Sequence, residues 1–70
     1  MAEETILVNG EAMPLTGATV EDLLRDMSVD PSARGFAVAV NQAVVVRAMW
    51  RKTELRAGDQ VEIVKPFAGG

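Results

Sequence analysis

The sequence predicts an α+β fold in which one mixed sheet of four or five strands carries a single helix packed on one face. Three observations support this prediction. Turn residues divide the chain into short β-prone runs, one segment has helical periodicity, and 49% of the residues are hydrophobic. Seventy residues suffice for one domain only. We expect that domain to span residues 1–64 and to be followed by a flexible C-terminal tail, residues 65–70, which ends in Gly-Gly.

The first expected element is a hairpin. Residues 5–8 are β-prone, Asn9-Gly10 follows at once, and residues 11–15 form the return strand. Asn-Gly between apolar segments favours a two-residue type I′ turn, because both central positions of that turn need a positive φ. Pro14 has no N–H to donate to a neighbouring strand, so we expect the return strand to lie at a sheet edge.

One helix is expected after this hairpin. Its apolar stripe recurs at i, i+3, i+4 and i+7 and consists of Val20, Leu23, Leu24 and Met27. Thr19 is a suitable N-cap, and Asp22 stands where a capping box needs an acidic residue. Pro31 prevents any continuation of the helix, so residues 28–35 are interpreted as a loop.

The remaining strands are expected at residues 36–40, 43–46 and 60–64, with Asn41-Gln42 as the turn of a second hairpin and one helical turn near Trp50. The last strand has to lie between the two hairpins, beside the first strand, to close a single core. This arrangement is the β-grasp, or ubiquitin-like, fold. Met13, Met27 and Met49 are expected to fill gaps in the core. Glu62 alternates with apolar neighbours and should face solvent.

The composition excludes several classes of function. The chain has no cysteine and no histidine, which removes disulfides, thiolate nucleophiles and the usual general base. We therefore expect no catalytic residue, no metal site and no bound cofactor, so the protein should not be an enzyme. A net charge of -3 argues against nucleic acid as a partner. With no apolar run of membrane-spanning length and no signal peptide, we expect a cytoplasmic protein, monomeric by itself, that has no membrane partner.

The C-terminal carboxylate is then the group best suited to chemistry. Gly69 and Gly70 have no Cβ, so the backbone of a partner enzyme could approach them closely. Joining the Gly70 carboxylate to AMP would create a good leaving group. A sulfur nucleophile on a partner could displace AMP and leave a thiocarboxylate. A Gly-Gly end also occurs as a frayed end or a cloning remnant, but here it follows a β-grasp pattern in a chain with few other reactive groups.

Several segments together resemble the ThiS family of ubiquitin-like sulfur carriers in thiamine biosynthesis. The matching segments are Ile-Leu-Val-Asn-Gly-Glu at residues 6–11, Thr-Val-Glu-Asp-Leu-Leu at 19–24, Val-Ala-Val-Asn at 38–41, residues 44–50 with Thr53 and Leu55, Gly-Asp-Gln-Val-Glu-Ile-Val at 58–64, and Gly69-Gly70.

The resemblance implies a route for sulfur. A ThiF-like adenylating enzyme would use ATP to activate Gly70, and a cysteine desulfurase system would supply the sulfur of the thiocarboxylate. A thiazole synthase would then accept that sulfur for the thiazole of thiamine. By position, the partner enzymes would recognise the tail at Phe67, Ala68 and Gly69.

Alternative interpretations remain open from the residues alone. The same carrier chemistry could feed molybdopterin, cysteine or another thiolated product. Gly70 could instead be attached to a lysine, as in a ubiquitin-like modifier. The chain could also be a plain β-grasp interaction module with an unused tail. Trp50 and Phe67 are each compatible with a partner contact or with local packing.

Overall fold

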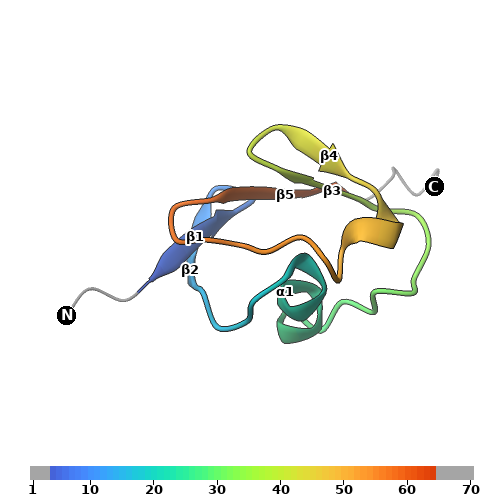
Figure 1. Ribbon diagram of the computed structural model, residues 1–70, viewed down its shortest axis with the longest axis horizontal. Helices are drawn as coiled ribbons and strands as arrows, with labels where there is room; N and C mark the ends of the chain where they lie inside the picture. Colours follow the sequence, from blue (N-terminus) through green and yellow to red (C-terminus); the bar gives the residue numbers. More distant parts are fainter. Residues whose placement is uncertain (1–3, 65–70) are drawn as a thin grey trace.

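A computed structural model describes residues 4–64, which contain five strands, one α-helix and one 3₁₀ helix (Figure 1). In chain order these elements are β1 (Thr5–Val8), β2 (Glu11–Pro14), α1 (Val20–Asp26), β3 (Ala37–Val40), β4 (Ala43–Val45), η1 (Arg47–Met49) and β5 (Gln60–Val64). The helical turn expected near Trp50 is thus η1, immediately before that residue.

The strands form one mixed sheet in the order β2-β1-β5-β3-β4. β1 pairs antiparallel with β2 and parallel with β5, and β3 pairs antiparallel with both β4 and β5. The last strand therefore lies between the two hairpins, and the predicted β-grasp arrangement is confirmed. β2 is an edge strand, which is where Pro14 is tolerated because no further strand needs its missing N–H.

Both hairpins turn through two residues with positive φ. Asn9 and Gly10 have φ values of 51° and 85°, and Asn41 and Gln42 have values of 51° and 73°. The first turn is the one that Asn-Gly predicts. The second has the same backbone signs although it contains glutamine, a residue that rarely adopts this conformation. The pairing of β3 with β4 therefore holds Gln42 in a conformation that its own preference does not favour.

The helix α1 begins at a complete capping box. The Asp22 backbone N–H donates to Thr19 Oγ1 at 3.2 Å, and the Thr19 backbone N–H donates to Asp22 Oδ2 at 3.1 Å. A third donor, the Ala18 backbone N–H, lies 2.9 Å from the same carboxylate oxygen. A Cβ on Gly17 would overlap the Cβ of Asp22, so only glycine fits there. The carboxylate of Asp22 thus fixes the chain direction into the helix.

The core lies between α1 and one face of the sheet (Figure 1). Its buried members are Ile6, Val8, Val20, Leu23, Leu24, Val38, Trp50, Leu55, Val61 and Ile63. Met13 and Met27 pack against this cluster, as predicted. Met49 is 44% exposed, so its predicted place in the core was wrong: it belongs to η1, none of whose residues is buried. No helix within residues 4–64 has the length and apolar character needed to cross a membrane.

The capping box predicts a pH-dependent contribution to stability. Hydrogen bonds from the backbone N–H groups of Ala18 and Thr19 lower the pKa of Asp22 below its ordinary value of 3.8. The ionised carboxylate therefore stabilises the fold above pH 3.8, and this contribution is lost as the pH falls through the lower folded-state pKa. We expect Asp22→Asn to be less stable than wild type at neutral pH, with a difference that shrinks in acid.

Urea unfolding at a series of pH values measures this difference. Glu11→Gln, which removes one carboxylate from an exposed position of β2, controls for the change in net charge. A deficit of the same size at every pH would contradict a role for the ionised form of Asp22.

Candidate functional site

The predicted site residues follow the last strand of the sheet. Gly70, Gly69, Ala68 and Phe67 lie outside the described residues. The last described residue is Val64, at the end of β5 in the middle of the sheet (Figure 1). The described part of the site therefore consists of the contacts that hold β5 and the surfaces around its C-terminal end.

The side chain of Asn9 holds β5 near its C-terminal end. Its Oδ1 accepts a hydrogen bond of 2.8 Å from the Ile63 backbone N–H, and its Nδ2 donates one of 3.3 Å to the Ile63 carbonyl. β1 ends at Val8, whereas β5 continues to Val64. The amide of Asn9 thus pairs with Ile63 where the backbone of β1 has already turned away.

Asn41 holds the other end of β5 in a similar way. Its Oδ1 accepts a 2.9 Å hydrogen bond from the Gln60 backbone N–H, and its own backbone N–H donates to the Gln60 carbonyl at 2.7 Å. Its Nδ2 also donates to Asp59 Oδ1 at 3.0 Å. Each hairpin turn therefore contributes one asparagine to the central strand, and the strand that leads to the tail is fixed at both ends.

Trp50 is a packing residue and not an exposed partner contact. Only 3% of it is exposed, and its Nε1 donates to the Val45 carbonyl at 2.8 Å, on the edge strand β4. The Phe36 and Trp50 ring centroids lie 5.1 Å apart in a stacked arrangement. The guanidinium carbon of Arg47 lies 4.6 Å from the Trp50 centroid and 5.6 Å from the Phe36 centroid. This stacking of a cation on two rings fixes the position of Phe36.

Arg47 also attaches the loop before β3 to the domain. Its guanidinium donates hydrogen bonds to the carbonyls of Pro31 and Ala33. The loop ends at a groove of about 390 Å³, which is lined by Gly35, Phe36, Ala37 and Val64. The cluster around Arg47 thus shapes the surface beside the end of β5.

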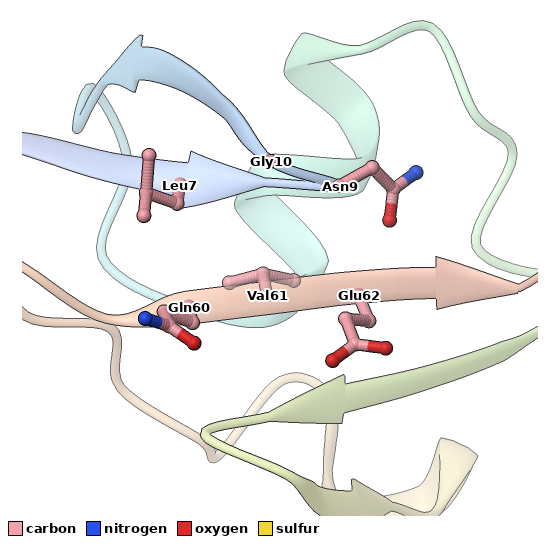
Figure 2. A pocket seen from close by; sticks show the side chains of 6 residues that line it. All are labelled: Leu7, Asn9, Gly10, Gln60, Val61 and Glu62. Atoms are coloured by element: carbon pink, nitrogen blue, oxygen red, sulfur yellow. The ribbon is translucent and has the colours of Figure 1, made fainter.

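The sheet has an open face, directed away from α1. Alternation along β5 turns Val61 and Ile63 toward the core and the other residues outward, and cross-strand pairing identifies their neighbours. The open face consists of Thr5, Leu7, Ala12, Pro14, Ala37, Ala39, Val44, Gln60, Glu62 and Val64. Its hollow of about 420 Å³, the open-face hollow, is lined by Leu7, Asn9, Gly10, Gln60, Val61 and Glu62 (Figure 2).

Residues 4–64 contain no group of three or more histidine, cysteine, aspartate or glutamate side chains placed to hold a metal ion. Glu62 is exposed, as predicted from its alternation with Val61 and Ile63. This part of the molecule holds β5 at both ends and presents surfaces beside its C-terminal end.

Comparison with known proteins gives matches over nearly the whole chain. The sequence model of the ThiS family matches residues 6–70. The sulfur carrier protein ThiS of Escherichia coli is 38% identical over 66 residues, which are 93% of this chain and 97% of that protein. The sulfur carrier protein ThiS of Thermus thermophilus is 35% identical over 65 residues, 93% of this chain and 98% of that protein.

A solved structure has the same fold. The crystal structure of the thiamine biosynthesis protein ThiS from Geobacter metallireducens superposes with a TM-score of 0.76 at 30% sequence identity. The superposition covers 94% of this chain and 99% of that one. The solution structure of a thiamine biosynthesis protein from the same organism gives a TM-score of 0.73, also at 30% identity, over 94% of this chain and 87% of that one.

The contact between Asn9 and Ile63 predicts a loss of stability in Asn9→Gly. Glycine accepts the positive φ of 51° without strain, so the variant removes the two side-chain hydrogen bonds and little else. We expect the free energy of unfolding to fall by about 1–3 kcal/mol, because the Ile63 amide loses its partner. Urea unfolding measures this loss, and hydrogen exchange should become faster at the Ile63 amide.

Gln42→Gly is the matched control. Gln42 occupies the corresponding turn with a φ of 73°, and its side chain makes no hydrogen bond within residues 4–64. Stability should therefore stay the same or rise slightly, since glycine relieves strain there. Equal losses in the two variants would show that the Asn9 amide contributes nothing specific to β5.

Proposed function

The chain belongs to the ThiS family, and on that basis we propose that it is a sulfur carrier protein of thiamine biosynthesis whose Gly70 carries sulfur as a C-terminal thiocarboxylate. The single observation that carries the proposal is the family match, which runs through Gly69 and Gly70. The central position of β5, with an asparagine at each end, supports it from the structural side.

The chemistry follows from the weakness of a carboxylate as an electrophile. An adenylating enzyme joins the Gly70 carboxylate to AMP, using ATP and releasing pyrophosphate. A persulfide supplied by a cysteine desulfurase system then attacks the acyl carbon through its outer sulfur, and AMP leaves with the electrons of its bond. A second thiol attacks the inner sulfur of the acyl disulfide so formed, which breaks the S–S bond, oxidises the two thiols to a disulfide and releases the thiocarboxylate. The resulting thiocarboxylate delivers sulfur to a thiazole synthase. The carrier is a co-substrate in this sequence and binds no cofactor, and ATP is bound by the partner.

The carrier contributes a rigid domain, residues 1–64, and a reactive end. Residues 65–70 span at most about 20 Å when extended. The acyl-transfer site of each partner must therefore lie within that distance of Val64 when the domain docks. The partner enzymes would contact Phe67, Ala68 and Gly69 between Val64 and the reactive end. Gly69 and Gly70 have no side chain, which leaves room for close contact with the partner backbone.

Thiamine is favoured over other destinations of the sulfur by the relatives. Both curated relatives are named sulfur carrier protein ThiS, and the solved structures are named as thiamine biosynthesis proteins. We place the protein in the cytoplasm, where ATP and the partner enzymes would be found, as a monomer when it is free. A role as a protein modifier would instead leave Gly70 joined to lysine side chains.

Gly70→Ala and Gly69→Ala test the need for small residues at the reactive end. We expect ATP–pyrophosphate exchange by the cognate adenylating enzyme to slow by about 10- to 100-fold, because an added methyl group displaces the carboxylate from its reactive position. Circular dichroism and thermal unfolding should match wild type, since the core consists of residues between Ile6 and Ile63. Normal exchange in both variants would contradict the proposed need for small residues at positions 69 and 70.

A free carboxylate on Gly70 is the second requirement. A peptide tag added after Gly70 should abolish exchange, whereas the same tag placed before Met1 should leave it unchanged. Intact-protein mass spectrometry of untagged protein from thiamine-starved cells should show one oxygen replaced by one sulfur in the last residue. If wild-type protein forms no acyl-adenylate at Gly70 with its cognate enzyme and ATP, the proposed function is wrong.

A further inference from the structure

The open face is an apolar surface that contains one charged side chain. Leu7, Val44 and Val64 are exposed by 38%, 74% and 58%. Ala37 and Ala39 fill the space between them on β3, and Ala39 is the cross-strand partner of Glu62. Exposed apolar side chains gathered on one face are a feature of surfaces that another protein covers.

Glu62 restricts which partner surfaces can bind the open face. Within residues 4–64 the one ion pair joins Arg25 to Glu21, and no side-chain hydrogen bond involves Glu62. Among the described residues, its carboxylate therefore has no charged or hydrogen-bonding partner. A partner that covers the face with apolar groups alone would bury an unpaired charge, which is strongly unfavourable. A partner that brings a cation avoids this cost.

The open-face hollow has the shape and lining for that cation. It lies between β1 and β5 and measures about 420 Å³, with the exposed Leu7 side chain as its apolar wall (Figure 2). Gln60 and Glu62 lie on the same side of β5 and supply an amide oxygen and a carboxylate. Gly10 adds no side chain, which leaves the hollow open beside the turn. The aliphatic part of a lysine or arginine side chain fits against Leu7 while its charged end reaches the Glu62 carboxylate.

We propose that the open-face hollow receives a lysine or arginine side chain of the adenylating enzyme, with the Glu62 carboxylate as its charged anchor. This inference rests on the proposed function, because it names the docking contact of that partner. The net charge of -3 adds a general attraction to a basic surface. The hollow then fixes the register of docking, since only one position on the open face can pair with the cation.

The anchor lies close to the start of the tail. Glu62 precedes Val64 by two positions on β5, a distance of about 7 Å along a strand. Asn41 and Asn9 hold this strand on either side of Glu62, at Gln60 and Ile63. A cation bound to Glu62 therefore orients the end of β5, and with it the direction in which the tail leaves, relative to the nucleotide site of the enzyme.

The test compares Glu62→Gln with Glu54→Gln. Both variants remove one negative charge, but Glu54 is an exposed residue that bridges to Thr19 at the start of α1, away from the open face. ATP–pyrophosphate exchange by the cognate adenylating enzyme gives KM and kcat for each carrier at low and high salt. We expect Glu62→Gln to raise KM by about 30-fold or more with kcat unchanged, and Glu54→Gln to change KM less than about twofold.

Gln60→Glu is a second variant that is expected to bind the enzyme more tightly, a result that misfolding of the carrier could not produce. A second carboxylate at the hollow should lower KM by about two- to fivefold at low salt, and the gain should disappear at high salt. An unchanged KM in Glu62→Gln, or equal increases in both Glu→Gln variants, would overturn the proposed anchor. Self-association of Glu62→Gln in light scattering with normal KM would also overturn it, because Glu62 would then serve to keep copies apart. No exchange with wild-type carrier would overturn the proposed function itself.

Discussion

The insertion of β5 between β1 and β3 is the constraint on which the rest of the structure depends. Its parallel pairing with β1 and antiparallel pairing with β3 join two hairpins that otherwise share no hydrogen bonds in the sheet. Its inward side chains, Val61 and Ile63, complete the surface that α1 covers. Because the backbone of β1 ends early, Asn9 extends the pairing by its side chain, and the strand stays ordered up to its last residues.

The short helix depends on this sheet as much as the sheet depends on the helix. An isolated helix of seven residues would be unstable in water, so α1 persists through its capping box and through burial of Val20, Leu23 and Leu24. In turn it covers the apolar face of five short strands. The Arg47 cluster then fastens the long loop between α1 and β3, where few apolar residues are available for packing. A domain of this size has stability only as a whole.

Most of the fold follows from local signals, whereas the contacts that hold the site do not. Asn9-Gly10, the spacing from Val20 to Met27 and the edge preference of Pro14 each reflect local physics. The strand order then follows from the need to close a single core over both hairpins. The role of the Asn9 amide involves Ile63, 54 positions away, so the sequence marks Asn9 only as a turn residue. Arg47 and Trp50 are only three positions apart, but their stacking was missed because it depends on the turn of η1 and on the ring of Phe36. The tail residues Phe67 to Gly70 were predicted from composition and resemblance, and they stay a prediction.

The order in which the strands leave the ribosome has a consequence for the cell. β5 is made last of the described strands yet occupies the middle of the sheet, so the two hairpins have no common core until β5 has been made. A prematurely terminated chain therefore lacks both a stable domain and the glycines that follow β5. Chains that stop before β5 therefore leave the apolar surfaces of both hairpins and of α1 uncovered, which exposes them to aggregation and proteolysis.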